Sequence, residues 1–203
     1  MTAKYILPMF LAAFTMTNAA KATTIFNFDS DNLGTTTSFT DTVNGLSATF
    51  SSAADPGGFV IYSSMFVTLT GNVLGDPGPA GIDGLALDIA FNSDLNAIDL
   101  SFATADFGTP SPVTLTAYEN STLVGANTLS GMFIGSSLFP EGEIAFDGAT
   151  FNNVVISSSA MDFAVDNIAV SSVPEPGPFT LVAGGIALLA IGSLRRTPAL
   201  GRR

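Results

Sequence analysis

Apolar side chains at every second position are the feature that most constrains the fold of this chain. Residues 85–91 alternate leucine, isoleucine or phenylalanine with alanine or aspartate, and residues 98–102 repeat the pattern. A period of two fits a β-strand that is buried on one face, whereas an amphipathic helix needs apolar residues three and four positions apart. The sequence therefore predicts a strand in each of these two segments.

Seven further segments rich in Val, Ile, Phe and Thr are also typical of strands. They are residues 24–28, 46–50, 66–70, 113–118, 143–146, 151–156 and 163–170. Turn-forming pairs such as Asn44-Gly45 and Asp147-Gly148 separate them, and the Gly and Pro content of residues 76–84 predicts a surface loop. No segment of residues 23–172 keeps a helical pattern for three turns. We therefore predict an all-β fold, an antiparallel β-sandwich of the jelly-roll type with roughly eight to ten strands.

The first 22 residues have the organisation of a secretory signal peptide. Lys4 and the amino terminus supply positive charge, residues 6–16 are apolar, and Ala20-Lys21-Ala22 forms a small-x-small cleavage site. An apolar stretch of this length is too short to span a bilayer, which needs about twenty residues. We expect a signal peptide helix that is removed by cleavage after Ala22.

Residues 173–203 combine a short motif, an apolar run and a basic end. The motif is Val173-Pro174-Glu175-Pro176, the run covers residues 179–194, and the basic residues are Arg195, Arg196, Arg202 and Arg203. The run can enter a bilayer as a transmembrane helix, and the arginines hold its far end on the cytoplasmic side. With the signal peptide, this topology leaves residues 23–172 outside the cytoplasm.

This tail resembles the PEP-CTERM sorting signal of Gram-negative bacteria in all three parts. In that family an exosortase, a membrane-embedded cysteine protease-like enzyme, processes the tail during export, in bacteria that make extracellular polysaccharide or biofilm. The resemblance implies exosortase and the secretion machinery as partners and membrane attachment in transit. It also implies a final location at the cell surface or in the extracellular matrix. The alternative is a single-pass anchor that follows a proline-rich turn.

Residues 23–172 contain no basic side chain. All six Lys and Arg residues lie in the terminal segments, the chain has no His, and sixteen of its seventeen acidic residues fall within this region. Phosphate binding depends on Lys and Arg, so this balance argues against nucleic acid and anionic membrane surfaces as partners. Cations are the partners that the charge favours.

Residues 151–156 and 163–170 resemble the closing strand pair of lectin-like and carbohydrate-binding-module-like jelly rolls. In that group the aspartate of the last strand often joins a carboxylate near the first strand in holding a structural calcium, which implies such a role for Asp166. The alternation of apolar residues also breaks at Asp166-Asn167. This break predicts a bulge or an inward carboxylate there.

A buried carboxylate without a basic partner needs backbone amides, a proton or a cation. Asp29 and Asp31 follow the first predicted strand, and their spacing of two suits the oxygen ligands that calcium prefers. We therefore predict a structural calcium site formed by Asp29, Asp31 and Asp166. The alternative is that Asp29 and Asp31 cap a turn while Asp166 is exposed at a strand edge.

Most side chains that enzymes use as nucleophiles or bases are missing from residues 23–172. Without His, Cys or Lys in this region, triad and Schiff-base mechanisms are excluded, and zinc hydrolysis loses its usual ligands. A carboxylate pair from Glu119, Glu141 and Glu143 could still serve glycoside hydrolysis. Because Glu141-Gly142-Glu143 is more simply a polar loop and strand start, we expect no enzymatic activity.

Two non-catalytic functions remain open. The fold resemblance and the export signals favour association with extracellular polysaccharide. An exposed Tyr62 or Tyr118 beside Asn or Asp would provide a platform for a sugar ring. The alternative is a purely structural acidic surface protein without a specific glycan ligand, whose charge keeps it soluble and binds divalent ions diffusely.

Overall fold

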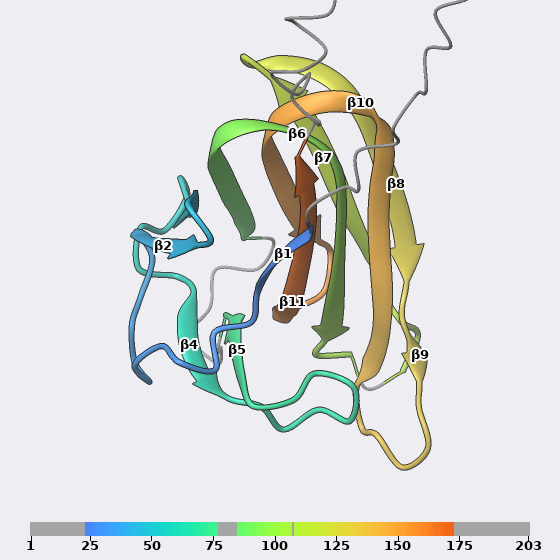
Figure 1. The fold of residues 1–203 in the computed structure, drawn as a ribbon. Coiled ribbons are helices and arrows are strands. Elements are labelled where there is room, and N and C mark those ends of the chain that lie inside the picture. The colour runs from blue at the N-terminus through green and yellow to red at the C-terminus, as the bar shows by residue number, and fades with distance from the viewer. Residues whose placement is uncertain (1–22, 77–84, 107, 173–203) are drawn as a thin grey trace, which may run out of the picture.

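The computed structural model describes residues 23–76, 85–106 and 108–172. The predicted signal peptide, most of the predicted loop and the predicted sorting tail with its transmembrane helix lie outside these residues. The described part is built from β-strands and turns, without an α-helix (Figure 1). No helix in these ranges could therefore cross a membrane. The prediction of an all-β fold is confirmed.

Eleven strands form the described structure, and every pairing between them is antiparallel. They are β1 (Thr23–Phe26), β2 (Phe39–Val43), β3 (Leu46–Ser51), β4 (Val60–Ser63), β5 (Asn72–Gly75), β6 (Ala86–Thr104), β7 (Pro112–Glu119), β8 (Thr122–Ser130), β9 (Met132–Phe133), β10 (Pro140–Ser158) and β11 (Phe163–Ser172).

The long strands β6 and β10 join the two layers of the fold because each takes part in both. The first half of β6 pairs with β3 and with the second half of β10, which also pairs with β7. The second half of β6 pairs with β11 and with the first half of β10. One continuous sheet therefore bends into a β-sandwich (Figure 1). The jelly-roll connectivity within this sandwich stays a prediction.

The first and last described strands lie next to each other. β1 pairs with β11 over its whole length, so that Thr23 is opposite Ser171. The hairpin of β4 and β5 extends the same layer through pairs between β5 and β11. Both ends of the described chain therefore leave the sandwich at one end, as Figure 1 shows.

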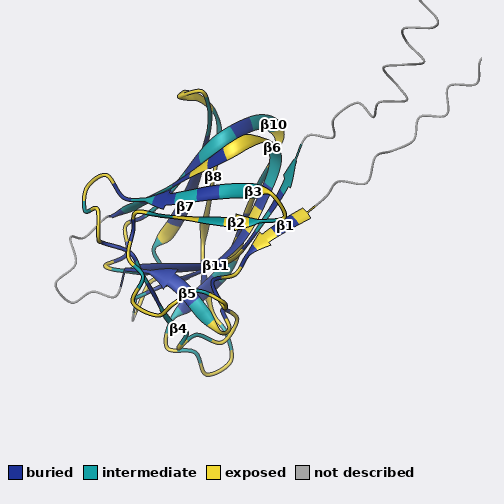
Figure 2. Ribbon diagram, turned by 60° about the vertical axis from the view of Figure 1, so that its left-hand side comes forward, coloured by how far each residue is buried: buried dark blue, intermediate teal, exposed yellow. Residues whose placement is uncertain are grey.

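Phenylalanine dominates the core between the two layers. Phe26 and Phe28 both pack edge-on against Phe50, with ring centroids 6.2 Å and 5.4 Å away. The alternation along β6 places Leu87 and Ile89 in this core, and the residues between and beside them are less buried. Figure 2 shows buried and more exposed residues alternating along the strands. The main cluster of buried side chains lies wholly between residues 26 and 170, so residues 23–172 have a core of their own.

The strand predicted at residues 66–70 is wrong, because this segment is a loop between β4 and β5. Its backbone amides at Val67 and Thr68 donate to the side chain of Glu141 instead of to a neighbouring strand. A short run rich in Val and Thr has a high strand propensity. Here, however, a carboxylate distant in sequence accepts the hydrogen bonds of two of its backbone amides.

The turn predicted at Asp147-Gly148 is also wrong, since β10 continues through it. The pairing of β10 with β6 shifts in register between Asp147 and Phe151, and Gly148 has a φ of 99°. The glycine therefore serves a β-bulge, which lets one strand pass from the first layer to the second.

Candidate functional site

Asp166 lies at a bulge in β11 with its side chain fully buried. The register with β6 shifts between Asp166 and Ala169, and Asn167 has a φ of 51°. The Asp166 carboxylate is 0% exposed, and it accepts hydrogen bonds from the Asn167 amide at 2.7 Å and from Asn167 Nδ2 at 3.0 Å. The predicted bulge and inward carboxylate are both confirmed, and the alternative of an exposed edge residue is wrong.

Burial raises the pKa of Asp166 to about 6. The backbone amides of Asn167 and Thr70 favour the charged form, and the negative charge of Asp29 opposes it. The effect of burial is larger than that of the amides, so this carboxyl gains a proton at a pH where an ordinary aspartate is ionised.

Asp29 lies near Asp166 and caps the start of β5. Its Oδ1 accepts a hydrogen bond from the Asn72 amide at 2.9 Å. The Asn72 side chain in turn donates to the carbonyl oxygens of Phe28 and Asp31 at 3.3 Å and 3.4 Å. These contacts tie the turn after β1 to the β4–β5 hairpin and bring two of the three predicted calcium ligands to one region.

Asp31 does not complete the predicted calcium site. Its acidic neighbour is Asp41, and burial followed by the charge of Asp41 raises its pKa. Within the part of the chain that the structure describes, no three Asp, Glu, His or Cys side chains are grouped to hold a metal ion. Asp29 and Asp166 accept hydrogen bonds from N–H groups of Asn72 and Asn167, so a cation bound by this pair must displace some of these hydrogen bonds. Calcium binding there stays a prediction.

Gly71 allows Asp29 to approach the hairpin. Its φ is 73°, and a Cβ placed on it would lie 1.8 Å from Asp29 Oδ1. We expect Gly71→Ala to lower the free energy of unfolding by about 2 kcal/mol or more, since it forces a strained backbone and displaces the cap.

The matched control is Gly34→Ala, because Gly34 has a φ of 83° but nothing within 4 Å of the added Cβ. Denaturant unfolding of both variants measures their free energies of unfolding. Gly34→Ala reports backbone strain alone, and Gly71→Ala reports strain together with the clash against Asp29. Equal losses of stability would contradict the role assigned to Asp29.

A second feature is a polar hollow of about 460 Å³ on the outer face of β6, β7 and β10. It is lined by outward-facing side chains, among them Tyr118, Asp88, Asn120, Asn152 and Asn153. Tyr118 is half-buried rather than exposed, and it lines the hollow. The arrangement matches the predicted surroundings of a tyrosine platform, an aromatic ring beside Asn and Asp.

Hydrogen bonds between its polar residues fix the shape of this hollow. Asn153 donates to Asp88 at 2.6 Å, and Asn152 donates to Asp94 at 3.3 Å and to Asn120 at 3.2 Å. The Asn120 amide donates back to Asn152 at 3.1 Å. Donors and acceptors are therefore held beside the Tyr118 ring before any ligand arrives.

Tyr62 belongs to a different place. It lines an apolar pocket at the ends of β4, β5 and β11, together with Phe66 and Phe139. Burial raises the pKa of its phenol, and the negative charges of Asp162 and Asp76 raise it further. The two predicted tyrosine platforms therefore do not form one site.

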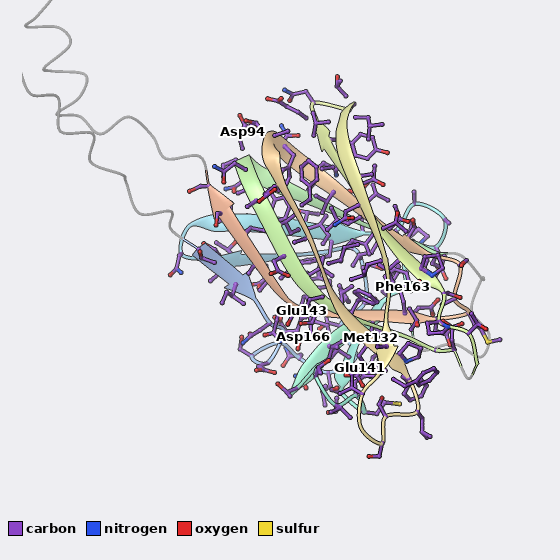
Figure 3. The ribbon with its side chains drawn as sticks, turned by 90° about the vertical axis from the view of Figure 1, so that its right-hand side faces the viewer. Asp94, Met132, Glu141, Glu143, Phe163 and Asp166 are labelled. Atoms are coloured by element: carbon purple, nitrogen blue, oxygen red, sulfur yellow. The ribbon has the colours of Figure 1, made fainter. Side chains whose placement is uncertain are left out.

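Glu141 is a buried structural carboxylate, and the prediction of a polar loop is wrong for it. It is 0% exposed and accepts from the Val67 amide at 2.9 Å, from the amide and hydroxyl of Thr68 at 2.6 Å each, and from the Ser137 hydroxyl at 2.7 Å. Burial acts to raise its pKa, but these bonds outweigh burial and the pKa is lowered. In Figure 3 it lies near Met132, far from Asp94.

No signal in the sequence identifies this role. The partners of Glu141 at Val67 and Thr68 lie 74 and 73 positions away in the chain. Only the fold brings them together.

Comparison of the sequence with protein-family models finds no match, and comparison with curated proteins finds none either. Solved structures of similar fold include the cleaved adhesin domains K2 and K1 of Lys-gingipain, the latter from Porphyromonas gingivalis W83. K2 has a TM-score of 0.52 at 16% identity over 73% of this chain and 99% of its own. K1 has a TM-score of 0.51 at 9% identity over 75% of this chain and 99% of its own. At these identities the likeness establishes the fold alone.

Proposed function

We propose that residues 23–172 form a non-catalytic module that associates with extracellular polysaccharide. The observation that carries this proposal is the Tyr118 hollow, in which a half-buried aromatic ring lies beside Asp88, Asn120, Asn152 and Asn153. Sugars are bound by an aromatic ring against the apolar face of the pyranose and by amide and carboxylate groups at its hydroxyls. The hollow offers both in one place.

The charge of the module narrows the class of polysaccharide. Residues 23–172 carry sixteen acids and no Lys, Arg or His. An acidic polymer such as a uronic acid chain is repelled by this charge unless divalent cations bridge the polymer and the protein. Neutral and amino-sugar polymers are not repelled. The proposed ligands are therefore neutral glucans or partly deacetylated amino-sugar polymers.

A single substitution tests the hollow. We expect Tyr118→Ala to weaken binding of a soluble polysaccharide about tenfold or more, because it removes the stacking surface and leaves the sheet intact. Affinity electrophoresis or calorimetry of residues 23–172 with a neutral glucan, chitosan and alginate, each with calcium and with chelator, measures the change.

The control is Asp147→Asn, which alters the charge by one at an exposed position on β10, one of the strands that line the hollow. Diffuse electrostatic attraction to chitosan responds to Asp147→Asn and not to Tyr118→Ala, which leaves the charge unchanged, whereas binding in the hollow responds to Tyr118→Ala. Absence of binding to every polymer in both buffers supports the other candidate, a structural acidic surface protein.

We further propose that the chain is exported and sorted by an exosortase through Val173–Pro176. The resemblance of the tail to the PEP-CTERM signal supports this proposal. The adjacency of Thr23 and Ser171 is compatible with it, since the predicted targeting segments join the sandwich at one end. Mass spectrometry of the mature protein tests it, with cleavage after Ala22 and loss of the tail as the expected result.

The absence of catalysis is part of the same proposal. The four hydrogen bonds of Glu141 and its lowered pKa are unsuited to a general acid, which needs a raised one. Glu143 lies exposed on the neighbouring stretch of β10. Incubation with the bound polysaccharide should release no reducing sugar.

A further inference from the structure

A pocket of about 430 Å³ lies at the end of the sandwich opposite to Thr23 and Ser172. It opens where β5 and β6 end and β11 begins, near Phe163 in Figure 3. Its volume falls within the range of pockets that hold small organic ligands. The Tyr118 hollow is lined by none of the same residues, so the pocket is a separate site.

The walls of this pocket are mostly apolar and include four aromatic rings. Phe66 and Phe139 meet edge to face with ring centroids 5.4 Å apart, and Tyr62 and Phe163 add two further rings. Met65 and Met161 also line the pocket and are 67% and 60% exposed. Flexible methionines at an opening adapt to the shape of an apolar ligand.

Two carboxylates lie at the same pocket beside the Tyr62 hydroxyl. Tyr62 Oη lies over Gly75, because a Cβ on that glycine would be 2.8 Å from it, and Asp76 is the next residue. Asp162 also lines the pocket, and the charges of both aspartates act on the Tyr62 phenol. Backbone hydrogen bonds hold the two segments, from the Asp76 amide to the Phe163 carbonyl and from the Ala105 amide to the Asp162 carbonyl.

We propose that this pocket binds an amphipathic organic cation, whose apolar body contacts the phenylalanine and methionine walls and whose ammonium group meets Asp76 and Asp162. Charge complementarity selects this class of ligand. Residues 23–172 contain no Lys, Arg or His, so an entering cation meets no like charge from this region. Aromatic rings beside the carboxylates stabilise the cation further through cation–π contacts.

A carboxylate outside the pocket lining holds one wall of the pocket in place. Glu141 binds the loop that carries Phe66 and, through Ser137, the segment that carries Phe139. The Ser137 hydroxyl also bonds to the backbone of Phe139. The aromatic pair is therefore positioned before a ligand binds, which lowers the entropic cost of binding.

The test is a methyl NMR titration of residues 23–172 labelled at methionine. This stretch contains three methionines, Met65 and Met161 in the pocket lining and Met132 outside it. Hexylammonium is the probe, with hexanol and hexanoate as neutral and anionic analogues of the same length. We expect hexylammonium to shift the Met65 and Met161 signals and to leave Met132, which is 71% exposed, unchanged.

Charge variants complete the test. Asp162→Asn and Asp76→Asn should each weaken hexylammonium binding about fivefold or more, whereas Asp147→Asn at the exposed position on β10 should leave it unchanged. Hexanol binding as tightly as hexylammonium would overturn the proposal. So would equal shifts of all three methionine signals, or an equal effect of Asp147→Asn. If Asp76→Asn does not fold, Asp162→Asn and the three probes still decide the question.

Discussion

Glu141→Ala is expected to lower the free energy of unfolding by about 3 kcal/mol, because it removes the acceptor of four hydrogen bonds from a fully buried position. For a domain of this size, the loss corresponds to a fall of about 6–12 °C in melting temperature. The amides of Val67 and Thr68 should also exchange with solvent faster, since they donate to this carboxylate. Calorimetry and hydrogen exchange measure the two effects.

The pH dependence of Glu141 has a definite sign. Its folded-state pKa lies below the ordinary 4.5, so its stabilisation is present above pH 4.5 and is lost as the pH falls through the lowered pKa. The difference in free energy of unfolding between the wild type and Glu141→Gln should therefore become smaller at acid pH.

Glu143→Ala is the matched control, because Glu143 lies two positions along β10 with an exposed side chain. A Glu143→Ala variant as unstable as Glu141→Ala would show that the hydrogen bonds of Glu141 are not the cause.

Asp166 should have the opposite pH dependence. Its folded-state pKa of about 6 exceeds the ordinary 3.8, so between these values the folded protein keeps a proton that the unfolded chain has lost. The free energy of unfolding therefore decreases as the pH rises through this window, by about 3 kcal/mol in total at 1.36 kcal/mol per unit of pKa. In the presence of chelator, the free energy of unfolding of Asp166→Asn should depend less on pH in this window. The variant should also have a higher melting temperature than the wild type at pH 8.

Calcium provides a second readout on the same residue. If Asp29 and Asp166 hold a calcium ion, millimolar calcium raises the melting temperature of the wild type at pH 8 through linkage, and the effect fades near pH 4.5. Asp166→Asn should abolish the response, and Asp31→Asn shows whether Asp31 takes part. An identical melting temperature with calcium and with chelator at pH 8 would rule out the site.

The alternation of apolar residues was sufficient to predict the strands that lie in the middle of the sheet. Residues 86–91 and 98–102 both fall in β6, although the sequence did not reveal that one strand runs through both layers. The hairpin turn at Asn44-Gly45 was predictable from its residues, and both have the positive φ, 53° and 83°, that this turn requires. Local chemistry decides such features, so the sequence exposes them.

Features that depend on long-range contacts were not predictable. The sequence of residues 66–70 predicts a strand, but the segment is a loop whose amides donate to Glu141. The same holds for the candidate sites. Asp166 was identified because a polar residue interrupts an apolar pattern, and its burial is confirmed. The proximity of Asp31 to Asp41 and the different surroundings of Tyr62 and Tyr118 depend on the fold.

The position of β11 also determines how the molecule responds to force. This strand pairs with β6 along one side and with β1 and β5 along the other. A pull at Ser172 along the strand axis, as on a tethered protein in flowing liquid, loads the hydrogen bonds on both sides at the same time. Such shear requires many bonds to break together, whereas a peeled edge strand loses them one by one. The last described strand is therefore held against a pull at Ser172 by hydrogen bonds along both of its edges.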